Sequence, residues 1–163
     1  MTADKDFKRI VRDHARQHGI SYAAARVRLR PDDDIRRREE PNVHFHRTAP
    51  ILRIFDETKA RQFYVDYLGM TVDFEHRFEP GMPLYLGLSR GDLAVHLSEH
   101  HGDGTPGTHV VVYTTGVEAL HAELQPKHDL GNIRPGLERD EIGTWLNLTD
   151  PFGNTLRLLE VAQ

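Results

Sequence analysis

The sequence has no cysteine among its 163 residues, which excludes disulfide bridges, thiolate nucleophiles and thiolate metal ligands. It has no apolar run near the roughly 20 residues that span a bilayer. Its first ten residues, MTADKDFKRI, are charged and lack the apolar core of a signal peptide. These absences lead us to expect a cytoplasmic protein without membrane association.

Catalytic motifs are also missing from the sequence. It contains no glycine-rich phosphate loop, no ordered Ser–His–Asp set and no paired-carboxylate motif. Apolar residues make up 38% of the chain, a low share for a compact domain, so we expect part of the chain to be exposed or elongated. The length predicts one ordinary domain with a small appendage.

Charge is distributed unevenly along the chain. Residues 1–40 contain 11 Lys/Arg and 8 Asp/Glu, whereas residues 41–163 contain 10 and 17. An acidic body favours cationic ligands over nucleic acid, although it also serves solubility alone.

The first 40 residues predict a helical, basic arm and a charged linker. Apolar spacing indicates one helix from Asp4 to Gly19 and a second from Ser21 to Arg30, and the charged linker then runs to Glu40. Six arginines of these helices suggest a helix-turn-helix: Arg9, Arg12, Arg16, Arg26, Arg28 and Arg30. Interleaved acidic residues weaken the basic face, so an arm that packs on the body or on a second subunit is favoured and nucleic-acid binding is not.

From Ala49 onward the pattern changes to short strands separated by single helices. Alternation and turn residues predict, in order, a strand at 50–55, a helix at 56–68, strands at 70–76, 84–89, 93–98 and 109–114, a helix at 117–124, and strands at 132–134, 145–149 and 155–160. The order strand–helix–strand–strand–strand thus occurs twice, with 57 residues between Leu52 and His109. We interpret this repeat as an internal duplication.

Two histidines, His96 and His109, lie on the strands that flank the central polar loop. Because alternate side chains of a strand share a face, both imidazoles can converge in one concave site. The pair predicts either a metal centre or a ligand pocket.

The segments KARQFYVDYLGMTVDF, LGLSRGDLAVHLS and DPFGNTLRLLE, in this doubled order, resemble the vicinal oxygen chelate superfamily, and most closely the glyoxalase/bleomycin-resistance proteins. The resemblance covers about residues 48–161 and leaves residues 1–47 outside. It implies an α+β fold of paired βαβββ modules that form a cupped sheet, here preceded by the helical arm. It also implies a homodimer, since family members commonly complete the cup across two subunits.

Metal-dependent members of this superfamily place ligands on the first and last strands of each module. The matching positions here are Ala49, His96, His109 and Arg157. Because only the histidines bind metals and enzyme sites normally need three protein ligands, no metal cofactor and no enzyme activity is favoured. The alternative is a metal-dependent lyase or dioxygenase that holds a divalent metal through His96 and His109. Further ligands for it would come from His44, His46, Glu99 or His100.

The bleomycin-resistance proteins lack the metal set and bind a bulky cationic antibiotic without chemistry. This resemblance implies a binding protein that sequesters such an antibiotic between aromatic walls in acidic surroundings. That branch tends to have tryptophan at the position of Ile142, whereas this chain places its only tryptophan at Trp145. The expected ligand-binding residues are Phe78, Tyr85, His96, His109, Tyr113, Trp145, Asn147 and Arg157.

Two further expectations concern Arg157 and the arm. Arg157 interrupts the apolar run LRLL, so an acidic neighbour or an anionic ligand is expected to pair with it. A third possible function is a DNA-associated regulator, in which the basic arm binds nucleic acid and the cup senses a ligand.

Overall fold

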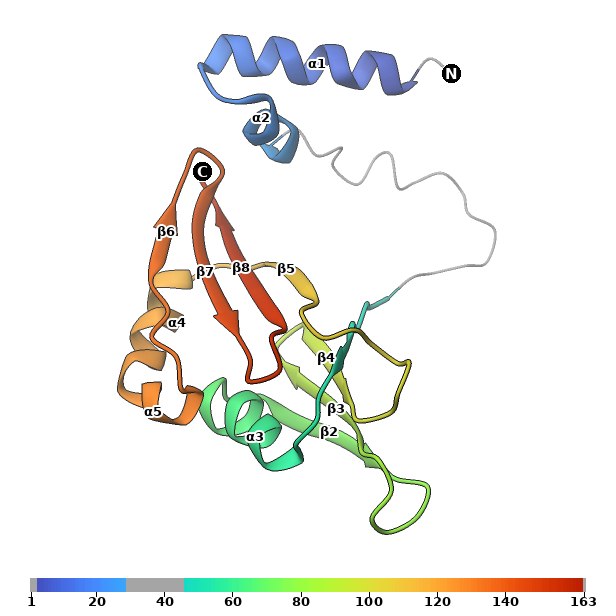
Figure 1. Cartoon of the computed structure of the whole chain (residues 1–163). Helices are drawn as coiled ribbons and strands as arrows, with labels where there is room; N and C mark the ends of the chain where they lie inside the picture. The colour runs from blue at the N-terminus through green and yellow to red at the C-terminus, as the bar shows by residue number, and fades with distance from the viewer. Residues whose placement is uncertain (1–2, 29–45, 163) are drawn as a thin grey trace. The chain divides into compact units, whose positions relative to one another are not determined.

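The computed structural model describes residues 3–28 and 46–162 of the chain (Figure 1). Arg30, the linker to Glu40 and His44 lie outside the described residues. Residues 47–138 and 145–160 form one compact unit, and the helical arm belongs to a second unit with residues 139–144 and 161–162. Within the described ranges no helix is both long enough and apolar enough to span a membrane.

The elements follow the predicted order. The helical segments are α1 (Ala3–His18), α2 (Tyr22–Arg28), α3 (Glu57–Arg61), the π-helix η1 (Gln62–Tyr67), α4 (Val117–Leu124), the 3-10 turn η2 (Gln125–Lys127) and α5 (His128–Gly131). The strands are β1 (Ile51–Arg53), β2 (Thr71–His76), β3 (Tyr85–Arg90), β4 (Leu93–Ser98), β5 (His109–Tyr113), β6 (Leu137–Arg139), β7 (Gly143–Thr149) and β8 (Thr155–Val161).

The eight strands form two four-stranded sheets with the same order, β1-β4-β3-β2 and β5-β8-β7-β6 (Figure 1). In each module the first strand along the chain, β1 or β5, pairs in parallel with the last, β4 or β8. Ile51 therefore lies opposite His96, and His109 lies opposite Thr155. This identity of order confirms the duplicated βαβββ module and the predicted α+β class.

Two of the predicted elements differ in the structure. No strand forms at 132–134, because Asn132 adopts a left-handed φ of 51° where α5 ends, and the strand lies instead at β6. The helix predicted over 56–68 changes its winding after Arg61. The N–H of Leu68 donates to the carbonyl of Phe63, five residues back, at 2.9 Å, as in a π-helix.

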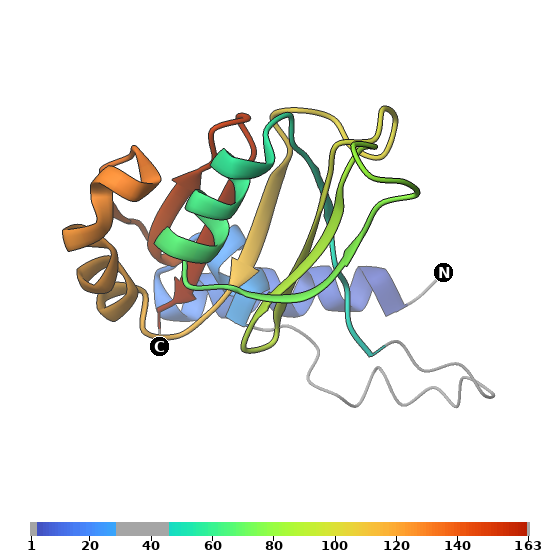
Figure 2. The same cartoon turned by 90° about the horizontal axis from the view of Figure 1, so that it is seen from below.

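Both sheets turn their apolar face toward one core, and α3–η1 also packs into it. Figure 2 shows the ribbons of the two sheets and of this helix. Leu86, Leu97, Leu146 and Leu156 are among the buried residues of this shared core. Side chains of the other parity lie on the opposite face of each sheet, which we call its open face. Both open faces therefore point away from the shared core.

A buried polar network joins the modules at the last hairpin. The carboxylate of Asp150, only 5% exposed, accepts hydrogen bonds from the Tyr64 hydroxyl at 2.7 Å and from the backbone N–H groups of Phe152 and Asn154 at 2.9 and 2.7 Å. The Asn154 side chain donates to Asp150 and to the carbonyl of Arg53, both at 2.8 Å. The network thus links η1, the β7–β8 turn and the end of β1.

The two helices of the arm contact each other. Val11 of α1 and Ala24 and Ala25 of α2 are buried. The Ser21 hydroxyl accepts a hydrogen bond from the N–H of Ala24 at 3.1 Å and so caps the N-terminus of α2.

We expect two tyrosines of η1 to respond oppositely to loss of their hydroxyl groups. Burial raises the pKa of Tyr64 well above its usual range, and the charge of Asp150 raises it further. The Tyr64 hydroxyl therefore stays protonated and donates to Asp150. Among the described residues the buried Tyr67 hydroxyl has no partner. Tyr64→Phe should lower the free energy of unfolding by about 1–3 kcal/mol, because it leaves a buried charged acceptor short of a donor. Tyr67→Phe should leave the free energy of unfolding unchanged or raise it. Urea unfolding of both variants measures the difference, and an equal loss of stability in both would contradict this explanation.

Helix α4 receives its N-terminal cap from another element. The N–H groups of Gly116 and Val117 each donate to the Glu160 carboxylate at 3.0 Å. These backbone hydrogen bonds hold the pKa of Glu160 below its usual value of 4.5, and hydrogen bonding from Arg90 lowers that of Glu123.

The two lowered pKa values predict an acid-sensitive stability. A carboxyl with a depressed folded-state pKa stabilises the fold above its unfolded pKa, and this contribution is lost as the pH falls through the folded pKa. The melting temperature should therefore fall as the pH drops below about 4.5. Glu160→Gln should make this dependence shallower, whereas the exposed Glu79→Gln should leave it unchanged. Calorimetric melts between pH 3 and 7 make the comparison, and parallel curves for both variants would refute the role of Glu160.

Candidate functional site

Three rings meet on the open face of the first sheet. The Tyr85 hydroxyl lies 2.9 Å from Nδ1 of His96, and the Phe74 ring is centred 5.3 Å from the His96 ring and 6.3 Å from the Tyr85 ring. The three residues come from the adjacent strands β2, β3 and β4. Such centroid distances are typical of favourable aromatic contacts.

Gly87 makes this arrangement possible. It stands opposite Phe74 in the β2–β3 pair and opposite His96 in the β3–β4 pair. A Cβ atom at Gly87 would lie 2.2 Å from Cε1 of Phe74, so any side chain there would displace the ring. The missing side chain therefore gives the Phe74 ring its place on the sheet.

Three more rings extend the group toward the end of β2. Phe78 contacts His76 and His100 edge-to-face, with centroid distances of 5.0 and 5.9 Å, and is 75% exposed. Phe74 is 45% exposed. We call the six residues the ring cluster: Phe74, His76, Phe78, Tyr85, His96 and His100. It offers exposed π-faces and imidazole nitrogens on one sheet face.

Carboxylates border the ring cluster. Burial raises the pKa of Tyr85, and the charge of Asp103 raises it further, so the phenol that is hydrogen-bonded to Nδ1 of His96 stays protonated. Asp103 is fixed by the Ser98 hydroxyl, which donates to it at 2.7 Å. On the β2 side Asp73 accepts from the Ser89 hydroxyl at 2.6 Å. Asp73 is also paired with Arg47, whose guanidinium lies 3.5 Å from it, so the negative charge beside the rings comes mainly from Asp103.

The open face of the second sheet carries a different group. The guanidinium of Arg157 lies 4.9 Å from the centre of the Trp145 ring, and its Nε donates to Oδ1 of Asn147 at 3.3 Å. In place of the expected acidic neighbour, an amide and an indole ring contact Arg157, because both lie next to it on β7. Cation–π contact of this kind holds the indole in a fixed orientation.

Strand β5 completes this second open face. His109 and Tyr113 are both exposed on it, Tyr113 by 47%, and Val111 between them pairs with Arg157. The eight predicted ligand residues therefore fall into two groups. Phe78, Tyr85 and His96 lie on the first open face. The second open face holds His109, Tyr113, Trp145, Asn147 and Arg157.

Sequence reasoning missed three residues of the first face, Phe74, His76 and Gly87. The signal for two of them was present, since Phe74, His76 and Phe78 alternate along the chain as residues of one strand face do. The role of Gly87 depends on the β2–β3 register, which shifts between Val72 and Phe74. That shift could not be predicted from the sequence.

The residues at the metal-ligand positions do not fit a metal ion. Ala49 has no donor atom, and the cationic Arg157 is engaged with Asn147 and Trp145. Within residues 3–28 and 46–162, no three His, Cys, Asp or Glu side chains are grouped so as to hold a metal. Nδ1 of His96 is already engaged in a hydrogen bond with the Tyr85 hydroxyl.

Comparison with known structures supports the fold. A bleomycin-binding protein from Streptomyces verticillus, solved with copper(II)-bleomycin, is 26% identical with a TM-score of 0.54, over 74% of this chain and 99% of that one. A bleomycin resistance determinant encoded on the transposon Tn5 is 23% identical with a TM-score of 0.57, over 73% and 100%. A glyoxylase/bleomycin resistance protein/dioxygenase domain from Frankia sp. EAN1pec is 14% identical with a TM-score of 0.58, over 74% and 100%.

A protein-family model matches most of the chain. No curated protein sequence matches it. Residues 33–163 match the family described as glyoxalase superfamily protein, which covers more than half of the chain and agrees with the paired βαβββ modules. The chain therefore belongs to the glyoxalase superfamily, whose vicinal oxygen chelate fold its motifs resemble.

Proposed function

We propose that this protein binds and sequesters a cationic, ring-bearing antibiotic of the bleomycin type, without catalysing a reaction. The observation that carries the proposal is the ring cluster, in which exposed aromatic and imidazole rings share one sheet face with carboxylates at its border. The likeness to the Streptomyces verticillus bleomycin-binding protein, at 26% identity, supports the same ligand class.

The chemistry of the ring cluster suits such a ligand. Exposed rings such as Phe74 and Phe78 gain free energy when a planar group stacks on them and excludes water. Asp103 attracts a cation, and the imidazoles of His76 and His100 supply hydrogen-bonding nitrogens. A flat, positively charged ligand with polar substituents matches all three properties.

The second open face supplies a further wall only if two chains associate. Both open faces point away from the core that joins the modules, so they do not close over one ligand within a chain. A homodimer in which the first open face of one chain meets the second open face of its partner brings the ring cluster together with Trp145. Strand β5 is an edge strand, which also favours association with another chain.

Titration calorimetry with metal-free bleomycin tests the proposal. We expect saturable binding near one ligand per chain and an affinity that falls as salt is added, because opposite charges contribute to the attraction. Trp145, the only tryptophan, should change its fluorescence on binding. Absence of both heat and fluorescence change would overturn the proposed ligand.

A matched pair of variants connects the binding to the ring cluster. Phe74→Ala removes an exposed ring of the cluster, and we expect it to weaken binding by about 1–3 kcal/mol. Leu130→Ala removes a similarly exposed apolar side chain from α5, away from both sheets' open faces, and should leave the affinity unchanged. Equal affinities of the two variants would exclude the ring cluster as the binding surface.

A further inference from the structure

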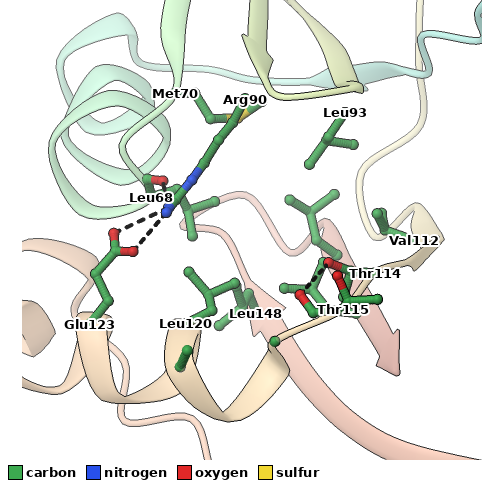
Figure 3. A pocket seen from close by; sticks show the side chains of 14 residues that line it. Leu68, Met70, Arg90, Leu93, Val112, Thr114, Thr115, Leu120, Glu123 and Leu148 are labelled. Carbon is green, nitrogen blue, oxygen red and sulfur yellow. Dashed lines mark hydrogen bonds and ion pairs between the residues drawn. The ribbon is translucent and has the colours of Figure 1, made fainter. Parts of the chain in front are cut away.

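A cavity of about 380 Å³ lies between the two modules, on the core side of the sheets (Figure 3). Met70 and Leu93 line it from the first module, and Leu148 and Leu158 line it from the second. Leu93 faces the core, whereas His96 on the same strand lies on the open face. The cavity is therefore distinct from the ring cluster.

The cavity carries almost no net charge. Among the described residues that line it, Arg90 and Glu123 alone are charged, and they form a bidentate pair with N–O distances of 3.2 and 2.6 Å. Nη1 of Arg90 also donates to the carbonyl of Leu68 at 2.5 Å. Figure 3 shows this pair on one side of the cavity, with Thr114 and Thr115 beside Val112 on the other. A charged ligand would lose its hydration and find no unpaired counter-charge there.

We infer that this cavity is a second binding site, for an uncharged, mostly hydrocarbon molecule of one or two rings with a single hydrogen-bonding group. Its volume lies at the small end of the range of about 300–1,000 Å³ for ligand pockets. The leucine and methionine walls bind the hydrocarbon part by burial of apolar surface. Thr114 and Thr115 provide hydroxyl and carbonyl groups for the polar end. The inference does not rest on the proposed antibiotic binding.

A neutral fluorescent probe with two fused rings and one carbonyl group, 6-propionyl-2-(dimethylamino)naphthalene, tests the site on the full chain. We expect a saturable rise in emission with one probe per chain and a higher melting temperature in its presence, because the probe binds the folded protein. Bleomycin should not displace it, since the ring cluster lies on the other side of the sheet. No saturable emission, or full displacement by bleomycin, would overturn the inference.

Two alanines of α4 give a matched pair of variants. Ala119 lines the cavity and is exposed at its mouth, whereas Ala122 is exposed on the same helix and does not line it. Ala119→Trp should weaken probe binding at least tenfold, Ala119→Leu should weaken it by a smaller factor, and Ala122→Trp should leave it unchanged. Circular dichroism confirms that each variant is folded. Equal probe affinity in Ala119→Trp and Ala122→Trp would exclude this cavity as the site.

Discussion

Replacing Asp150 with alanine is expected to lower the free energy of unfolding by about 3 kcal/mol, since several buried donors lose their acceptor at once. The Tyr64 hydroxyl, the Asn154 side chain and two backbone N–H groups all donate to this carboxylate. Removing a single partner of a buried charged network leaves the other groups desolvated and unpaired. Urea unfolding at neutral pH, with the slope compared between variants, measures the effect.

Asp140 provides the matched control for Asp150. It also accepts two backbone hydrogen bonds in a turn, from Ile142 at 2.8 Å and Gly143 at 3.0 Å, but it is exposed. Water can replace the lost acceptor there, so Asp140→Ala should cost about 1 kcal/mol or less. If the two variants lost equal stability, the buried network at the last hairpin would not be what joins the modules.

The same hairpin illustrates why much of the fold was predictable from the sequence. The segment DPFGN combines a turn-forming proline and glycine with Asp and Asn side chains that bond the backbone locally, and Gly153 adopts a φ of +88°. The alternation of Leu156, Leu158 and their neighbours then fixes which face is buried. Local chemistry of this kind is readable from adjacent residues.

The arrangement of the candidate site depended on information that is not local. The alternation of Phe74, His76 and Phe78 was visible, but their contact with Tyr85 and His96 requires the register of β2 on β3. Strand alternation in the sequence predicted that both histidines face one concave site. It gave no sign that the apolar faces of both sheets share one core, which leaves His96 and His109 on separate open faces. Packing between distant segments decides that arrangement.

A mixed dimer of two different variants should recover the unmodified affinity, which neither variant has alone. In the proposed homodimer each site combines the ring cluster of one chain with Trp145 of the other. In the Phe74→Ala and Trp145→Ala homodimers, every site then contains one substituted residue. Each homodimer should bind metal-free bleomycin about 1–3 kcal/mol more weakly, or roughly 5- to 150-fold. A dimer with one chain of each kind has one site in which neither residue is substituted and one site in which both are.

The mixed dimer is therefore expected to bind half as many ligands as the unmodified dimer, at the unmodified affinity. Co-expression with two different affinity tags isolates it, and ultracentrifugation should give about twice the chain mass of 18.7 kDa. Calorimetry then measures stoichiometry and affinity separately. If each site were built within one chain, every site of the mixed dimer would still contain one substituted residue. No binding at the unmodified affinity would then be observed. A monomer at all concentrations would equally exclude a shared site, while leaving the ring cluster testable through Phe74→Ala.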